Sequence, residues 1–118
     1  MSWTLTVSGA AVTKAGVNAP TALLNDDTAL SRLSTDAEGA MTAEAGYDFV
    51  ANYSLFSTNG KTALSEANST LIAFYIVHNN LSAYPGGEGR TMLDALSDRY
   101  NKMMTKLKKA DDRRPLLS

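Results

Sequence analysis

A phosphate-binding loop is the first chemistry that the sequence suggests, because Gly60-Lys61-Thr62 matches the last three positions of that motif. In such a loop, backbone amides and the lysine ammonium hold the phosphates of a nucleotide. The complete motif also needs a glycine five residues before Gly60, and that position holds Leu55. A buried strand should precede the loop, whereas the residues before Leu55 are polar and aromatic. We therefore interpret Asn59-Gly60 as a turn into a helix, expect Lys61 to be a solvated lysine in its first turn, and predict no nucleotide cofactor.

No other set of residues has the types and spacing of a catalytic or metal-binding site. The chain has one histidine, His78, and no cysteine, so neither a histidine-rich nor a thiolate metal centre can form. The adjacent carboxylates of Asp26-Asp27 and of Asp111-Asp112 would point in different directions on a helix, which makes them poor acid–base pairs. We interpret His78 as a residue at the edge of the core. The sequence thus predicts no catalytic residue, metal, cofactor or small-molecule substrate, and a protein that is not an enzyme.

The segment SAYPGGEGR, residues 82–90, is the second cluster of glycines. It lacks the G-x-G-x-x-G spacing and the preceding strand of a dinucleotide-binding turn. Two interpretations stay open: a flexible connection between two helices, or a loop that changes shape when a partner docks.

Charge is distributed unevenly, although the net charge is only −1. Residues 1–60 hold two basic and six acidic side chains, whereas residues 61–118 hold nine basic and six acidic ones. Such a chain can attract copies of itself head to tail, or the charges can simply cover solvated faces. Most of the basic residues lie near the end of the chain: Arg90, Arg99, Lys102, Lys106, Lys108, Lys109, Arg113 and Arg114.

Apolar residues recur at spacings of three and four along three long segments, which is the pattern of amphipathic helices. The first segment opens at Asn25-Asp26-Asp27 and its pattern continues through Tyr47 towards Tyr53, with a kink expected near Ser34. The second runs from residue 60 or 61 to residue 81, and the third from about residue 91 to 109. A short helix is also predicted over residues 8–16, with Gly16 at its C-terminal end.

The second long segment should form the central helix, because LIAFYIV (residues 71–77) is apolar almost all round. We expect Leu71, Phe74 and Leu96 to be buried where the second and third helices meet. The sequence therefore predicts an all-α fold: a small bundle of three main helices plus a short N-terminal helix. Residues 1–110 should form a single helical domain, with residues 1–7 as an extended arm and residues 111–118 as a C-terminal tail.

The chain shows neither the signal-peptide pattern at its start nor an apolar run long enough to span a membrane. We therefore expect no contact with a membrane and a reducing cytoplasm as the place of synthesis.

The order of these segments resembles that of small head–tail connector proteins of tailed bacteriophages, the adaptors that bind beneath the portal. The resemblance is carried by the central helix TALSEANSTLIAFYIVHNNLSAY, the glycine-bearing loop, the helix that opens with TMLDALSDRYNKMM, and the basic tail. The opening WTLTVSGAAVTKAG, the acidic stretch DAEGAM and the loop followed by TMLDAL are also similar to those of other phage proteins, whose role the resemblance does not give. The similarity extends over residues 3–108.

The resemblance implies a structural protein of the virion neck, made in the host cytoplasm and without an active site. Adaptors of this class are helical and form a ring on the portal protein, a dodecamer, which extends the DNA channel and receives further neck or tail proteins. Non-specific contact with the channel DNA would also follow.

The terminal segments of such adaptors reach into neighbouring chains, which makes both ends of this sequence candidate interaction sites. In the tail ADDRRPLLS, two leucines would fill an apolar groove while two arginines meet carboxylates of a neighbour or a DNA phosphate. The candidate protein-interaction residues are Trp3, Arg113, Arg114, Leu116 and Leu117.

Two other function classes stay open. One is a small helical nucleic-acid-binding or regulatory phage protein that uses the basic C-terminal helix. Aspartates interrupt that helix, and aromatic residues are sparse in it, so base-specific recognition is not supported. The other is an enzyme whose site is assembled without a recognisable motif.

Overall fold

Four α-helices dominate the part of the chain that the computed structural model describes, namely residues 4–6, 8–16, 26–108 and 117. They are α1 (Ser8–Ala15), α3 (Asp27–Ala45), α4 (Thr58–Asn79) and α5 (Glu88–Lys108). Single 3₁₀ turns, η1 (Tyr53–Leu55) and η2 (Leu81–Ala83), follow α3 and α4. None of the described residues belongs to a strand, and the predicted all-α fold is confirmed.

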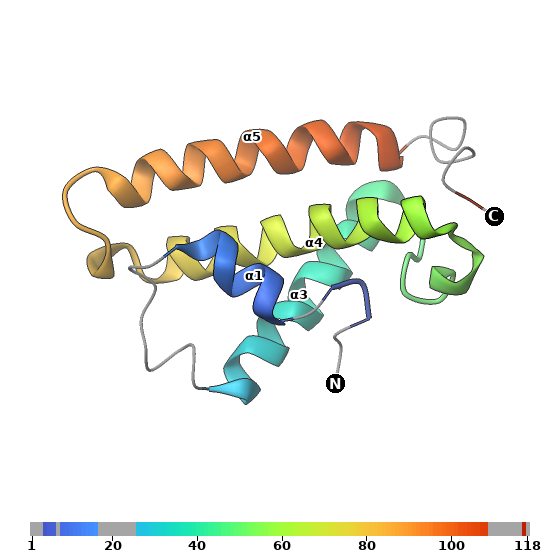
Figure 1. Ribbon diagram of the computed structural model, residues 1–118, viewed down its shortest axis with the longest axis horizontal. Coiled ribbons are helices and arrows are strands. Elements are labelled where there is room, and N and C mark those ends of the chain that lie inside the picture. Colours follow the sequence, from blue (N-terminus) through green and yellow to red (C-terminus); the bar gives the residue numbers. More distant parts are fainter. Residues whose placement is uncertain (1–3, 7, 17–25, 109–116, 118) are drawn as a thin grey trace.

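Helix α4 is the centre of the bundle and contacts each of the other three helices (Figure 1). Helix α5 runs antiparallel to α4 along its length, and α1 lies against α4 on another side. Helix α3 begins far from α5 and approaches it only where both helices end (Figure 1).

Local capping explains where the long helices begin and end. The Asp26 side chain accepts a hydrogen bond from the Ala29 amide at 3.0 Å, which confirms the predicted start of α3. Gly46 ends α3 with a left-handed φ of 66°. The prediction that this helix continues through Tyr47 towards Tyr53 is wrong, because the chain turns at Gly46. Ser34 is buried inside α3 and does not cap a second helix.

An aromatic cluster replaces the expected helix extension. The rings of Tyr47, Phe49 and Phe56 lie with centroids 5.3 to 6.2 Å apart, in edge and tilted arrangements. Phe49 and Phe56 are buried, so the connection between α3 and α4 closes one end of the core. Helix α4 then begins at Thr58, before the predicted residue 60, because Ser57 caps it.

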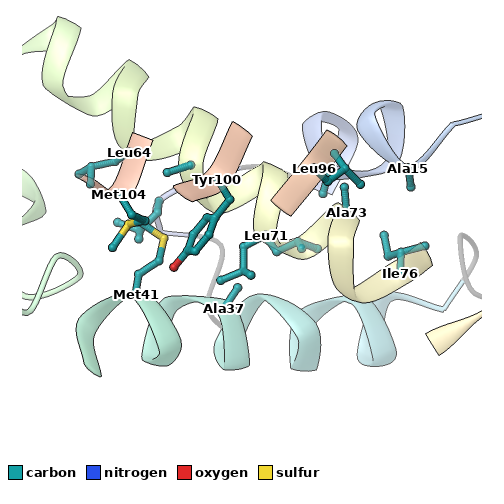
Figure 2. Close-up of a cluster of buried hydrophobic side chains, with 14 of the residues drawn as sticks. Ala15, Ala37, Met41, Leu64, Leu71, Ala73, Ile76, Leu96, Tyr100 and Met104 are labelled. Carbon is teal, nitrogen blue, oxygen red and sulfur yellow. The ribbon is translucent and has the colours of Figure 1, made fainter. Parts of the chain in front are cut away.

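The hydrophobic core lies along α4, which is the predicted central helix (Figure 2). Leu71 and Leu96 are buried as predicted. Phe74 is only half-buried, so the prediction that it is buried is wrong: it packs against the edge of the core and its ring stacks on His78. The core residues labelled in Figure 2 are Ala15 from α1, Ala37 and Met41 from α3, Leu64, Leu71, Ala73 and Ile76 from α4, and Leu96, Tyr100 and Met104 from α5.

The connection between α4 and α5 is anchored at one residue. The buried Tyr84 hydroxyl donates a hydrogen bond to the Ala15 carbonyl oxygen at 2.7 Å. This bond satisfies a carbonyl at the end of α1, just before Gly16, whose φ of 89° ends that helix as predicted. The glycine-bearing segment is thus tied to the first helix at Tyr84.

We expect Asn68→Leu to raise the free energy of unfolding by about 1 kcal/mol. Asn68 is fully buried, and its Nδ2 donates to the Met41 sulfur at 3.5 Å, while its Oδ1 has no hydrogen-bond partner among the described residues. Leucine has a similar branched shape and leaves no polar atom unsatisfied. Urea unfolding measures the effect, with Asn68→Ala as the control that creates a cavity and lowers stability. A loss in the leucine variant as large as in the alanine variant would contradict this account.

Candidate interaction surface

The predicted interaction residues at the two ends of the chain are mostly outside the described part. Trp3, Arg113, Arg114 and Leu116 belong to segments that the structure does not describe. Leu117 is half-buried against the core and forms an isolated antiparallel bridge with Phe56. Within one chain, this leucine therefore contacts its own domain, and the role of all five residues between chains stays a prediction.

A buried carboxylate holds the described part of the N-terminal arm. Oε2 of Glu38, in the middle of α3, accepts hydrogen bonds from the backbone amides of Thr4 and Leu5 at 3.0 and 3.1 Å. The Leu5 side chain is buried, and the Thr6 hydroxyl hydrogen-bonds the Ser65 hydroxyl at 2.8 Å. Residues 4–6 consequently lie on their own domain. The apolar spacing of the sequence does not show that Glu38 is buried, so this contact could not be predicted from it.

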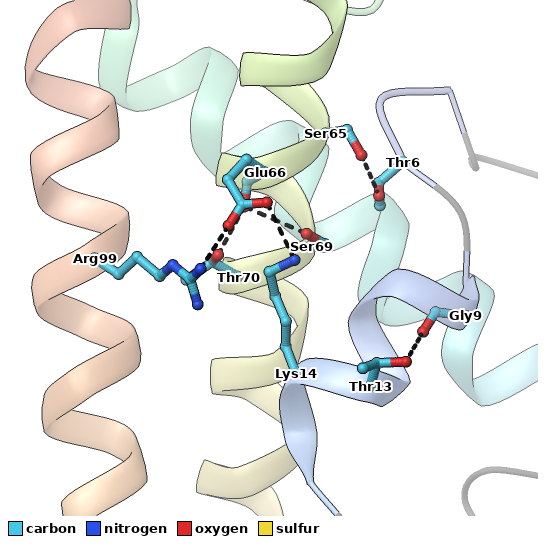
Figure 3. A network of polar contacts seen from close by, with 9 residues as sticks. All are labelled: Thr6, Gly9, Thr13, Lys14, Ser65, Glu66, Ser69, Thr70 and Arg99. Atoms are coloured by element: carbon cyan, nitrogen blue, oxygen red, sulfur yellow. Dashed lines mark hydrogen bonds and ion pairs between the residues drawn. The ribbon is translucent and has the colours of Figure 1, made fainter.

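A second carboxylate joins three helices (Figure 3). Glu66 on α4 forms ion pairs with Lys14 of α1 at 3.3 Å and with Arg99 of α5 at 3.1 Å. Its backbone carbonyl also accepts the hydroxyls of the buried Ser69 and Thr70. These bonds satisfy polar groups on the central helix and fix the positions of α1 and α5 against it.

A third carboxylate joins α3 to the end of α5. Glu44 forms an ion pair with Lys108 at 2.9 Å and accepts a hydrogen bond from the Tyr100 hydroxyl at 3.1 Å. Burial, the negative charge of Glu44 and this hydrogen bond raise the pKa of the Tyr100 phenol well above its usual range. Two basic residues of α5, Arg99 and Lys108, are thus engaged by acids of other helices.

An apolar hollow of about 380 Å³ lies between α4 and α5. Its described lining combines Ala63, Met103 and Leu107 with two lysines, Lys102 and Lys106. Lys102 pairs with Asp98 at 3.0 Å, but 76% of the lysine side chain is exposed, so this pair holds it weakly. We call this site the lysine-rimmed hollow. It offers an apolar floor and cationic edges to a partner. The spacing of residues in the sequence does not predict this site.

The Gly-Lys-Thr segment lies in the first turns of α4, which Ser57 caps. The Gly60 amide donates to the Ser57 hydroxyl at 3.1 Å, so the helix cap already uses a group that a phosphate would need. The Lys61 ammonium lies 5.0 Å from the centre of the Tyr53 ring, in a cation–π contact. Lys61 is half-buried and therefore less solvated than predicted.

Two further features are absent from the described residues. They contain no cluster of histidine and carboxylate side chains that could hold a metal ion. None of their helices combines the length and the apolarity needed to cross a membrane.

No family model, curated protein or solved structure matches this chain.

We expect stability to fall as the pH rises above about 10, the ordinary pKa of tyrosine. The unfolded chain loses the Tyr100 proton near that pH, whereas the raised pKa in the folded state keeps the phenol protonated. The stabilisation is thus fully present below pH ~10 and is lost as the pH rises towards the folded pKa. Urea unfolding at about pH 8 and about pH 11 tests this, and Tyr100→Phe should show a smaller loss. Equal losses in both proteins would contradict it.

We expect Glu38→Ala to lower the free energy of unfolding by about 2 kcal/mol, because it leaves two amides without an acceptor. The amide protons of Thr4 and Leu5 should exchange with solvent faster in hydrogen-exchange measurements. Glu38→Gln keeps a side-chain oxygen and should show a smaller change in both readouts. Unchanged exchange at Thr4 and Leu5 in the alanine variant would mean that Glu38 does not hold this segment.

Proposed function

We propose that this chain is a structural protein of the tailed-bacteriophage neck, a head–tail connector adaptor that forms a ring on the portal and joins it to the tail. The observation that carries the proposal is the lysine-rimmed hollow on the α4–α5 pair, a binding surface built from two long packed helices. The resemblance of the helix order and of the short sequence strings to such adaptors supports the same assignment.

The chemistry of the hollow favours a protein partner. Its floor is formed by methionine, leucine and alanine side chains. Covering these side chains with an apolar side chain of a partner removes apolar surface from water, which is favourable. Its two lysines suit carboxylates at the edge of the same contact. An acidic and apolar segment of the portal or of another neck protein combines these two features.

The ion pairs of α5 weigh against nucleic acid as the main partner. Arg99 and Lys108 each pair with a carboxylate of another helix in the same chain. Asp94 and Asp98 are exposed on the same helix and would repel phosphates. Non-specific contact with DNA in the channel remains compatible with the exposed lysines, whereas a dedicated nucleic-acid-binding role is the second candidate.

We expect Lys102→Glu combined with Lys106→Glu to weaken attachment to purified portal rings of the same phage at least about tenfold, or about 1.4 kcal/mol. The reversed charges would repel the acidic partner at the edge of the hollow. Co-sedimentation of the protein with the rings measures the attachment. Arg90→Glu reverses one exposed basic residue at the other end of α5, and this control should bind normally.

Duplex DNA provides the competing outcome. The wild-type protein could instead fail to bind portal rings and bind duplex DNA with an affinity that falls steeply as the salt concentration rises. If the lysine variants lose this DNA binding, the nucleic-acid role is correct and the adaptor role is wrong.

A further inference from the structure

The first turn of α4 contains a pair of residues with a chemistry of its own. Asn59 is exposed there, and Gly60 is the only glycine in the sequence that follows an asparagine. Such a pair can modify itself, because the backbone nitrogen of the glycine is able to attack the side-chain amide carbon of the asparagine. Glycine permits this attack best, since it has no side chain to shield its nitrogen and its backbone angles are the least restricted. The binding surface proposed above does not use this pair.

The reaction needs only the chain and water. The Gly60 nitrogen gives up its proton to water and bonds to Cγ of Asn59, and the side-chain nitrogen of Asn59 leaves as ammonia. The product is a five-membered cyclic imide. Water then opens the imide at one of its two carbonyl carbons. One opening leaves an ordinary aspartate, and the other leaves an isoaspartate, in which the main chain continues through the side-chain carbonyl. No group is oxidised or reduced.

The capped first turn of α4 opposes this reaction. The Gly60 amide donates its proton to the Ser57 hydroxyl at 3.1 Å, so the proton that must leave is engaged. The Lys61 amide donates to the Ser57 carbonyl oxygen at 2.8 Å, which holds the same turn in its helical conformation. At a helical ψ of about −42°, the next backbone nitrogen is turned away from the side chain and the flat imide ring cannot close. The reaction therefore requires the cap to open.

The contacts that keep this turn closed are local. Two buried residues, Phe56 and Leu64, anchor the chain before and after it. Between them, the Ser57 cap is supported by a hydrogen bond of 3.1 Å from the Thr62 hydroxyl to the Thr58 carbonyl oxygen. Helix ends open at a lower free energy than the core does, so this turn opens far more often than the whole protein unfolds.

We infer that Asn59 is a site of spontaneous and irreversible modification, and that the Ser57 cap sets its rate. Each opening of the first turn lets the Gly60 nitrogen close on the Asn59 side chain, whereas the capped turn excludes the attack. The fraction of modified chains therefore increases with time and measures how often the start of α4 has been open. The inference does not depend on the adaptor role and needs no partner.

The two products have opposite effects on α4. An ordinary aspartate places a negative charge at the N-terminal end of the helix, where the helix dipole stabilises it. An isoaspartate adds one carbon to the main chain within the first turn, which moves Gly60 away from its acceptor on Ser57. The same shift displaces the Lys61 ammonium from the Tyr53 ring, whose centre lies 5.0 Å away. The first product thus preserves the cap, and the second breaks it.

Peptide mapping by mass spectrometry tests the inference on the full-length protein, stored at mildly alkaline pH. The peptide that contains Asn59 should gain the mass difference between water and ammonia, and chromatography should separate its aspartate and isoaspartate forms. Asn59→Gln keeps a side-chain amide at the same place but would need a six-membered ring, so this control should stay unmodified over the same period. Asn101, which is exposed on α5 and precedes a lysine, should also stay unmodified.

Variants of the cap test what sets the rate. Ser57→Ala removes the acceptor of the Gly60 proton and should speed up the conversion about fivefold, the usual effect of a lost N-cap on opening. Ser57→Asp keeps an acceptor at the cap and should convert at nearly the wild-type rate. In urea, where α4 is unfolded, all three proteins should convert at one common rate, at least about tenfold faster than the folded wild type.

Three results would overturn the inference. If Asn59 stays intact even in urea, the pair is not reactive. If Ser57→Ala converts no faster than the wild type, or if folding does not slow the conversion, the cap does not control the site. Equal conversion at Asn101 would mean that Gly60 does not direct the modification. None of these measurements involves portal rings, so the adaptor role is tested separately.

Discussion

The burial of α4 is the constraint on which the rest of the structure depends. A helix that is apolar almost all round cannot lie on a surface, so it needs other helices on several sides. Helices α1, α3 and α5 provide that cover, and each contacts α4. The same burial forces polar groups such as Ser69 and Thr70 to bond to the helix backbone, through the carbonyl of Glu66. Asn68 is the exception, since its Oδ1 lacks a described partner.

Three glutamates connect the elements around this helix. Glu38 holds the N-terminal segment, Glu44 holds the end of α5, and Glu66 joins α1 and α5 to α4. The acidic first half and basic second half of the chain are therefore partly neutralised inside one molecule, where Glu44 meets Lys108. This reduces the charge that is left for contacts with other molecules. Exposed charges remain at sites such as Asp36 and Lys106.

The helices could be predicted from the sequence because apolar spacing reports which face of a segment is buried. The spacing cannot report whether a neighbouring helix extends far enough to cover that face. Phe74 lies three residues after the core residue Leu71 on α4, yet it is only half-buried and its ring stacks on His78. The end of α3 was missed for a local reason, since Gly46 adopts a left-handed conformation that the apolar pattern does not reveal. The lysine-rimmed hollow arises from the packing of two helices, so neither helix encodes it alone.

The lysine-rimmed hollow has a physical origin in the packing of two helices. It lies between antiparallel α4 and α5, where Ala63 and Met103 are only half-buried and two lysines border them. A monomer that leaves these apolar atoms uncovered forgoes hydrophobic stabilisation which a complex would recover. The lysines would then favour acidic partners, because apolar contacts alone do not distinguish one partner from another. In such a complex the apolar floor would supply affinity, and the lysines that no acid of another helix engages would supply specificity.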